Sequence, residues 1–409
     1  MKLLKVDTIA SARDKSVRVM QKKGIQTVCK KLLEAQGYIL AGDIVSQEPV
    51  PAFNRSTVDG YAVRSGDTAG SSESLPVFLE CVDEINMGCP AKKEIHAGEC
   101  AYVPTGGMIP PGADAVVMIE YCEAFGGSNI AIYNPVSYGK NVVLAGEDID
   151  QGEIVIKKGT RIRPQEIGAM ASLGITEVLV FKPWEITIIS TGDELVSPHI
   201  TPSPGEVRDI NSYSLYAQAQ KHGLTVLNTV VQKDNEQQLK EAVMQAMQVS
   251  DLVVISGGSS KGKKDATNQI IDEAASEGSF IHGLALKPGK PTIVGYDENS
   301  RTLLTGLPGH PVAAMLVFEL LVIWVWRHMT CQPADSSLFA RITSNLAGAP
   351  GKMTCQLVKL IKQENGFYAE PIFGKSGLIT TLTRADGYIL IEENKEGLKK
   401  DEIVEVFYI

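Results

Sequence analysis

Residues 185–329 alternate between short apolar segments and amphipathic segments, and this alternation restricts the fold more than any other feature of the chain. Apolar runs such as 185–191 (EITIIST) and 251–256 (DLVVIS) have the length and composition of buried strands. The segments between such runs have helical spacing, and a helix that joins two strands of one sheet usually leaves those strands parallel. We therefore predict a doubly wound, mostly parallel α/β domain at residues 181–332, with helices on both faces of its sheet.

Two helices of this region have distinctive sequences. The segment 211–223 opens on Asn211, which we expect to cap a helix, and ends at Gly223, which allows the backbone to turn. The segment 312–326 (VAAMLVFELLVIWVW) is the longest apolar run, but it contains Glu319 and is shorter than the roughly 20 residues that a membrane crossing requires. We interpret it as a buried helix.

The rest of the chain has a different pattern, and at 409 residues the protein is too long for a single core. We predict helical structure in residues 1–50, with a helix at 27–44 where apolar residues recur every three or four positions, and a short helix at 163–175 within residues 144–180. Short apolar runs separated by Gly, Pro and Asn predict a small β domain at 51–143 and a small C-terminal β barrel at 333–409.

The net charge and the cysteines narrow the possible functions. A net charge of −9 provides no basic field for nucleic acid or an anionic membrane, so an anionic ligand needs local cations, backbone N–H groups or a metal. The 7 Cys are scattered without a C-x-x-C pair, as is typical of reduced thiols in a cytosolic protein. The N-terminal residues contain no apolar segment of the signal-peptide type, so we expect a cytoplasmic protein.

A glycine-rich segment, 255–267 (ISGGSSKGKKDAT), follows a predicted strand and leads into a predicted helix. Glycine turns bring backbone N–H groups close to an anion, and the N-terminus of a helix adds a favourable dipole. The segment nearly matches a nucleotide-binding P-loop, but Lys264 stands where Ser or Thr would bind Mg²⁺. Anion binding is the favoured interpretation, and a turn that binds nothing is the alternative. The candidate residues are Gly257, Gly258, Ser259 and Asp265.

Charged residues lie beyond the predicted strands. Asp193 and Glu194 follow the first strand, and Lys287 and Lys290 flank a Pro-Gly turn in 284–292 (LALKPGKPT). Ligands of open α/β sheets bind beyond the carboxyl ends of the strands, so these side chains could share one crevice. Carboxylates beside a phosphate require a divalent cation, and Mg²⁺ accepts one or two carboxylates together with phosphate oxygens. Helix capping and solvated surface charges are the alternative.

Polar loops in the predicted β domain and directly after it are further candidates. The segment 51–67 (PAFNRSTVDGYAVRSGD) contains Asp59, and Thr105, Glu147 and Asp148 lie in loops rich in Gly, Pro and Asp. Turn propensity alone also explains residues of these types.

Taken together, these segments resemble one family. The motifs FNRSTVDGYAVRSGD, PTGGMIPPGADAVV, GEDI, STGDEL, VRDINS, SGGSSKGKKD, LKPGKP and GLPGHPVAA follow one another in the order and spacing of the molybdopterin molybdenumtransferases, the family of MoeA and the gephyrin E domain. The resemblance covers essentially the full length. It implies a multidomain α/β and β fold in which residues 1–50 and 144–180 form one elongated, discontinuous helical part and the β domain at 51–143 is inserted in it. It also implies a homodimer whose active sites each lie between one subunit's α/β domain and the other subunit's β domain.

The resemblance also implies a reaction. Adenylylated molybdopterin reacts with molybdate in the presence of Mg²⁺, AMP is released, and molybdenum stays on the dithiolene of the pterin. The implied upstream partner is molybdopterin adenylyltransferase. Residues at matching positions imply catalytic roles for Asp59, Thr105, Asp148 and Glu194, and metal binding by Asp59, Asp193 and Glu194. The implied pterin-binding residues are Gly257, Gly258, Ser259, Asp265, Lys287, Lys290, Pro308, Pro311, Asp234 and Ser376.

The chain departs from the family pattern at several positions. An Arg run is replaced by Val143, Leu144 and Ala145, a basic residue by Gly283, a usual Asn by His310, and an expected Arg falls near Leu357. Cations elsewhere that could compensate are Lys261, Lys263, Lys264 and Lys352. These departures leave open a paralogue that binds molybdopterin without inserting metal. Separately, the glycine-rich loop leaves open a nucleotide hydrolase, and the similar size and charge of the two oxyanions leave open tungstate in place of molybdate.

Overall fold

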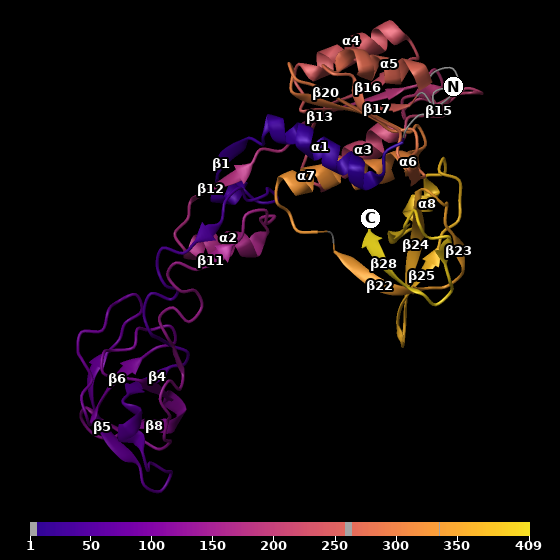
Figure 1. Cartoon of the computed structure of the whole chain (residues 1–409). Helices are drawn as coiled ribbons and strands as arrows, with labels where there is room; N and C mark the ends of the chain where they lie inside the picture. Colours follow the sequence, from indigo (N-terminus) through magenta and orange to yellow (C-terminus); the bar gives the residue numbers. More distant parts are fainter. Residues whose placement is uncertain (1–5, 258–263, 335) are drawn as a thin grey trace.

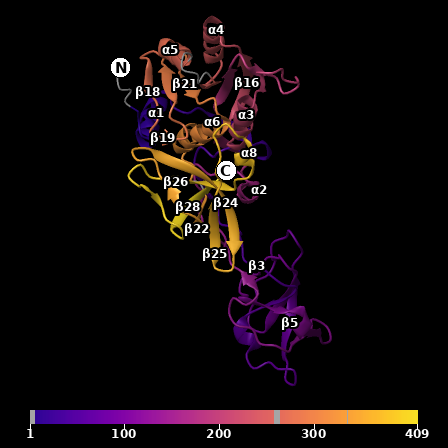
Figure 2. The ribbon, with the colours of Figure 1, turned by 90° about the vertical axis from the view of Figure 1, so that its right-hand side faces the viewer.

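The protein is elongated, with a β part at one end and an α/β part with an adjoining barrel at the other (Figures 1 and 2). The computed structural model describes residues 6–257, 264–334 and 336–409. A slender part formed by two separate stretches of the chain connects the ends (Figure 1).

The α/β part contains a six-stranded sheet in the order β16-β13-β17-β21-β20-β18. The first four strands are parallel and the last two are antiparallel to their neighbours, so the prediction of a mostly parallel sheet is confirmed. The strands are β13 (Glu185–Thr191), β16 (Thr225–Gln232), β17 (Leu252–Gly257), β18 (Ser279–His282), β20 (Ile293–Asp297) and β21 (Thr302–Leu307).

Helices cover both faces of this sheet because apolar side chains of its central strands alternate in direction. Ile188 of β13 packs on one face with helix α3 (Asn211–Lys221), and Ile189 packs on the other with α4 (Glu236–Met247) and α5 (Lys264–Ala274). Both faces of the central strands are therefore buried, which explains why those strands read as continuous apolar runs.

The longest apolar segment is a helix inside the core, as predicted. It runs through α6 (Pro311–Val317), the π-helical turn η4 (Phe318–Ile323) and α7 (Trp324–Met329). With a mean hydropathy of 1.7 it is long and apolar enough to cross a membrane, but 67% of it is buried inside the protein. Helix α1 (Ile9–Lys23) packs against it.

The connecting part is less helical than predicted. The predicted helix at 27–44 is wrong, because this segment begins with strand β1 (Thr27–Lys31), which pairs with β12 (Glu177–Phe181). The side chains of β1 alternate between exposed and half-buried, so the local spacing of apolar residues was ambiguous. The predicted helix at the end of this part is present as α2 (Pro164–Ser172). Strands β2 (Ile44–Val45) and β11 (Ile154–Ile156) pair nearby, and η1 (Leu32–Glu34) is a short 3₁₀ turn.

The β part is built on a six-stranded sheet in the order β7-β4-β6-β5-β9-β8. Its strands are β4 (Gly60–Val63), β5 (Val77–Glu84), β6 (Glu99–Val103), β7 (Ala115–Met118), β8 (Cys122–Ala124) and β9 (Asn129–Ile132). Gly60 opens the central strand β4 immediately after Asp59, and a Cβ at this position would collide with the carbonyl oxygen of Val117 on β7. The close approach of two strands therefore requires glycine at position 60.

The C-terminal part is a closed barrel, as predicted. Its strands follow the order β24-β25-β22-β28-β26, and β26 pairs again with β24. They are β22 (Ser337–Ile342), β24 (Met353–Gln363), β25 (Gly366–Pro371), β26 (Gly387–Ile391) and β28 (Ile403–Tyr408). Strand β19 (Leu286–Lys287) of the α/β part adds to β24 and so attaches the lysine turn to the barrel. The remaining elements are β3 (Arg55–Ser56), η2 (Ser65–Thr68), η3 (Ile119–Tyr121), β10 (Val142–Val143), β14 (Leu195–Val196), β15 (Val207–Arg208), β23 (Leu346–Ala347), α8 (Thr380–Thr383) and β27 (Gly397–Leu398).

Candidate functional site

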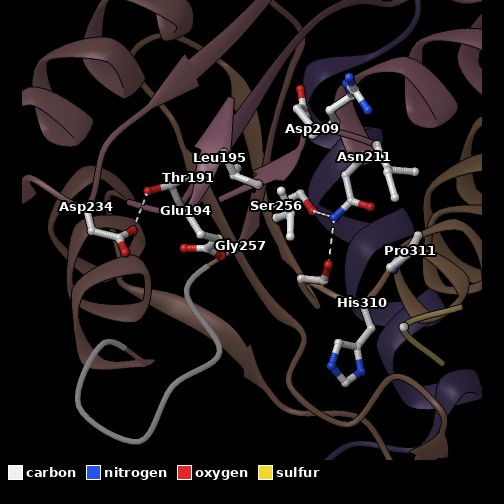
Figure 3. A pocket seen from close by; sticks show the side chains of 15 residues that line it. Thr191, Glu194, Leu195, Asp209, Asn211, Asp234, Ser256, Gly257, His310 and Pro311 are labelled. Atoms are coloured by element: carbon white, nitrogen blue, oxygen red, sulfur yellow. Dashed lines mark hydrogen bonds between the residues drawn. The ribbon is translucent and has the colours of Figure 1, made fainter. Parts of the chain in front are cut away.

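An acidic pocket of about 430 Å³ lies beyond the carboxyl ends of β13 and β17, where the sequence predicts a crevice. The N-terminal ends of α3 and of the helix that begins at Pro311 form the opposite wall (Figure 3). The pocket is lined by Thr191, Glu194, Leu195, Val207, Arg208, Asp209, Ile210, Asn211, Asp234, Ser256, Gly257, Gly309, His310, Pro311 and Gly377.

Asp234 is held at the rim of the acidic pocket by neighbouring strand ends. Its Oδ1 accepts a 2.9 Å hydrogen bond from the hydroxyl of Thr191, and its Oδ2 accepts a 3.3 Å bond from the backbone N–H of Asp193. The backbone N–H of Asp234 in turn donates to Oδ1 of Asp193 at 3.0 Å. The carboxylates that line the pocket at these strand ends are thus Asp234 and the exposed Glu194, whereas Asp193 is exposed but is not one of the lining residues.

The α3 side of the acidic pocket was not predicted as part of the site. Ile210 occupies the N-cap of α3, so the prediction that Asn211 caps this helix is wrong. The amide of Asn211 instead donates to the Ser256 hydroxyl at 2.8 Å and to the carbonyl of Gly309 at 2.9 Å. The physical reason is that Asn211 lies one position inside the helix, where its side chain reaches the neighbouring strand end.

Two buried oxygens on this side lack partners among the described residues. They are Oδ2 of Asp209 and Oδ1 of Asn211. A buried acceptor without a hydrogen bond is costly, so both oxygens suit a ligand that donates hydrogen bonds or carries a cation. The signal that could have identified this wall is the motif VRDINS, whose Asp and Asn are these two residues.

A lysine pocket of about 330 Å³ adjoins the acidic pocket. Lys287, Lys290 and Lys352 line it together with Ser376, and no carboxylate is among its lining residues. Within the described parts of the chain, none of these three ammonium groups pairs with a carboxylate. Such uncompensated cations favour a small, multiply charged anion. The full lining is Leu286, Lys287, Pro288, Gly289, Lys290, Pro291, Pro308, Gly309, His310, Ala313, Lys352 and Ser376.

The glycine-rich loop begins at the acidic pocket. Gly257 has a φ of +139°, and a Cβ there would collide with the carbonyl oxygen of Thr191, so this backbone position requires glycine. Gly258, Ser259, Lys261 and Lys263 lie outside the described residues. Asp265 falls in the first turn of α5, which begins at Lys264. Of the two predicted prolines, Pro311 lines the acidic pocket and Pro308 lines the lysine pocket.

Glu147 and Asp148 lie between β10 and β11, where the chain returns to the connecting part. Asp59 directly precedes β4 and Thr105 follows β6, and these strands lie in the β part at the far end of the molecule (Figures 1 and 2). Asp59 and Thr105 are brought together there, since the backbone N–H of Thr105 donates to Oδ1 of Asp59 at 2.8 Å. Glu147 is exposed and accepts a 2.7 Å bond from the N–H of Leu144, and Asp148 is exposed beside it. Within one chain, the predicted residues therefore form two separate sets, one around the two pockets and one in or next to the β part.

The departures from the family pattern have a visible consequence. Leu357 is 5% exposed and lines a third cavity of about 470 Å³, which shares Lys287, Pro288 and Ser376 with the lysine pocket. An apolar wall thus stands where the resemblance predicts a guanidinium. Gly283 adjoins the lysine turn, and its N–H donates to the carbonyl of Thr292 at 2.7 Å.

In the described ranges, no group of three or more His, Cys, Asp or Glu side chains is arranged to hold a metal ion. Mg²⁺ needs only one or two protein carboxylates when a phosphate supplies further ligands, and Glu194 and Asp234 on one pocket wall satisfy that requirement.

The fold is that of a multidomain protein in which two adjoining pockets, one lined by carboxylates and one by lysines, lie where an α/β sheet meets a β barrel. Three family models match the chain: MoeA N-terminal region (domain I and II) at residues 6–174, "Probable molybdopterin binding domain" at 187–328, and MoeA C-terminal region (domain IV) at 340–409. The chain belongs to the MoeA family.

Relatives of the chain agree with this assignment. A molybdopterin molybdenumtransferase of Bacillus subtilis is 32% identical over 395 residues, which cover 95% of this chain and 91% of the relative. A protein of the same name from Staphylococcus epidermidis is 30% identical over 423 residues, covering 98% and 95%. A crystal structure of the molybdopterin biosynthesis MoeA protein from Pyrococcus horikoshii superposes with a TM-score of 0.81 at 34% identity, covering 99% of both chains.

Proposed function

We propose that this protein is a molybdopterin molybdenumtransferase, which inserts molybdate-derived molybdenum into adenylylated molybdopterin and releases AMP. The observation that carries the proposal is the juxtaposition of the acidic pocket with the lysine pocket, which share Gly309 and His310. A phosphorylated pterin and a tetrahedral oxyanion are two anions that need two different environments side by side. The names of the curated relatives support the same reaction.

The two pockets would bind different parts of the reaction: the acidic pocket binds Mg²⁺ and the pterin, and the lysine pocket binds molybdate. Glu194 and Asp234 would hold Mg²⁺ against the pyrophosphate of the substrate, where it would offset negative charge on the phosphoryl oxygens. The buried acceptors of Asp209 and Asn211 suit the hydrogen-bond donors of a pterin ring. Lys287, Lys290 and Lys352 would bind molybdate as substrate in the adjoining pocket.

We further propose that the active protein is a homodimer with active sites between subunits. Asp59 directly precedes β4 and Thr105 follows β6, and these strands lie in the β part, at the opposite end of the molecule from the α/β part (Figures 1 and 2). One subunit therefore does not bring these two residues to its own acidic pocket. A second copy in antiparallel orientation would present its Asp59 loop there. The domain bounds given from sequence, a cytoplasmic location and an upstream molybdopterin adenylyltransferase remain parts of this proposal.

The test is release of AMP from purified adenylylated molybdopterin. The proposed enzyme requires molybdate and Mg²⁺ together, and it restores molybdoenzyme activity to a strain that lacks its own molybdenumtransferase. Pterin binding without molybdate-stimulated AMP release would instead indicate a non-inserting paralogue. Hydrolysis of ATP or GTP in the absence of pterin would indicate a nucleotide hydrolase, and a comparison of molybdate with tungstate decides the metal.

A further inference from the structure

His310 occupies the boundary between the two pockets. It and Gly309 are the residues that line both the acidic pocket and the lysine pocket. His310 is exposed and is the N-cap residue of the long helix that begins at Pro311. Figure 3 shows its ring directed away from Asp209 and Asn211, toward the outer edge of the acidic pocket. Its imidazole is therefore placed where two anionic groups of one reaction would meet.

The barrel fixes the orientation of this imidazole. Nδ1 of His310 lies 2.8 Å from the hydroxyl oxygen of Ser376, and the carbonyl of Ser376 accepts a 3.2 Å hydrogen bond from the N–H of Val312. From the other side, the amide of Asn211 holds the carbonyl of Gly309 at 2.9 Å. The turn that carries His310 is thus anchored to both the α/β part and the barrel. In the described part of the chain, the second ring nitrogen, Nε2, makes no hydrogen bond.

Protonation of the imidazole changes what this pair offers to an anion. When Nε2 alone carries a proton, the hydroxyl of Ser376 donates to Nδ1 and its hydrogen is occupied. When both nitrogens are protonated, Nδ1 donates to the Ser376 oxygen, and the hydroxyl hydrogen becomes available to another acceptor. One added proton therefore supplies a positive charge and releases a second donor beside the three lysines of the pocket.

We propose that His310 is an oxyanion-binding, specificity-determining residue that, together with Ser376, donates hydrogen bonds to a tetrahedral dianion in the lysine pocket. This inference rests on the proposed function. It identifies His310 as the residue that makes oxyanion binding in the lysine pocket depend on pH. Leu357 provides no positive charge where the family resemblance predicts an Arg. A protonated His310 would provide one in the lysine pocket. Binding of the dianion strengthens as the pH falls, because a proton on the imidazole adds a positive charge and frees the Ser376 hydroxyl hydrogen beside the lysine pocket.

The charged groups around His310 have opposite effects on the protonated form of its imidazole. Lys287, Lys290 and Lys352 of the lysine pocket disfavour a positive imidazole, as do Arg208 and Lys375 of the adjoining cavities. Glu194, Asp209 and Asp234 of the acidic pocket favour it. A dianion seated among the lysines reverses their effect because it neutralises the nearest positive charges. The proton on His310 and the dianion are therefore expected to bind cooperatively.

The experiment is calorimetric titration of the full-length protein with sodium molybdate at pH 6.5 and 8.0 and constant ionic strength. We expect the wild-type Kd to be about tenfold lower at pH 6.5, since a charge-assisted hydrogen bond is worth roughly that factor. The variant His310→Asn keeps a polar side chain without a titratable ring and should bind with nearly the same Kd at both pH values. The matched control Lys359→Ala, on an exposed position of β24, should retain the wild-type pH dependence.

Two outcomes overturn the inference: a wild-type Kd that does not change with pH, or a pH dependence that survives in His310→Asn. The variant Ser376→Ala adds a second measurement, since it removes the released donor and should lessen the pH effect without abolishing it. Circular dichroism and thermal unfolding verify that each variant is folded. AMP release measured in parallel separates the two proposals, because molybdate-dependent AMP release with pH-independent binding rejects only the role of His310. The reverse result, with pH-linked binding but no AMP release, rejects only the proposed reaction.

Discussion

The backbone N–H of Thr105 donates a 2.8 Å hydrogen bond to Oδ1 of Asp59, and so joins two loops at one edge of the β part. Asp59 itself is exposed, and Gly60 behind it is buried against β7. The loop is consequently rigid at its base while its carboxylate faces outward. In the proposed homodimer, this outward carboxylate would face the acidic pocket of the second subunit.

Asp59→Asn tests whether the charge of this carboxylate is used in the reaction. The new side chain retains an oxygen that accepts the Thr105 hydrogen bond, so the loop and the thermal stability should be unchanged. We expect the kcat for AMP release to fall by about a hundredfold, with a smaller change in the KM for the pterin, as for loss of an electrostatic contact to the transition state. Glu73→Gln, on an exposed position of the same part of the chain, is the control. Activity within twofold of wild type would remove Asp59 from the catalytic set.

Mixing two inactive variants tests where the active site is formed. If each site combines Glu194 of one subunit with Asp59 of the other, a mixed dimer of Asp59→Asn and Glu194→Gln chains contains one intact site and one doubly altered site. Random exchange of subunits should then restore about a quarter of the wild-type rate of AMP release, since about half of the dimers are mixed. Co-refolding followed by the AMP assay measures this. If the mixture is no more active than its components, the site is not shared between subunits.

The sequence was most informative where local pattern determines structure. The predicted strand at 185–191 matches β13 (Glu185–Thr191), because a strand buried on both faces is a continuous apolar run bounded by turns. The segment 27–44 was mispredicted because β1 is defined by its pairing with β12, far along the chain, and such pairing leaves no local signal. Apolar spacing in a short segment fits a helix or a strand equally well.

The site was predicted in part for the same physical reason. Glu194 and Gly257 were found because they directly follow strands whose carboxyl ends meet at one edge. Asp209 and His310 were not assigned to it, since their place depends on how α3 and the turn before Pro311 pack across the pocket. The contact between His310 and Ser376 joins two separate parts of the fold, and sequence spacing carries no information about it.

Gly257→Ala tests whether the end of β17 tolerates a side chain. The added Cβ would meet the carbonyl oxygen of Thr191, and a φ of +139° is strained for any other residue, so we expect a loss of about 1–3 kcal/mol in stability and weaker pterin binding. The matched control is Gly168→Ala within helix α2, where a Cβ meets nothing within 4 Å. That substitution should raise stability by about 0.5–1 kcal/mol. Thermal and urea unfolding measure both effects, and equal stability of the two variants would contradict the proposed strain.

The environment of Glu319 leads us to predict that the folded core loses stability in acid. Burial opposes its ionised form, but the hydrogen bond and charge of His222, the Gln218 amide and the charge of Arg327 outweigh burial, so the pKa of Glu319 is lowered. Oε2 of this carboxylate accepts from Gln218 at 2.7 Å and lies 3.0 Å from Nε2 of His222. Because the folded pKa lies below the ordinary value of about 4.3, the ionised group stabilises the fold above that pH, and this stabilisation is lost as the pH falls through the folded pKa.

Glu319→Gln should therefore lower the free energy of unfolding by roughly 1–3 kcal/mol at pH 7, since it removes a charged partner from a buried hydrogen-bond network. Between about pH 5 and pH 3 the wild type should lose stability more steeply than the variant, so the two curves converge. Urea unfolding followed by tryptophan fluorescence is a suitable measurement, because Trp184 and Trp326 are buried in this core with their rings 5.1 Å apart. Glu364→Gln, in an exposed turn, should leave the wild-type curve unchanged. Parallel curves for the wild type and Glu319→Gln across this range would mean that Glu319 does not titrate differently in the folded and unfolded states.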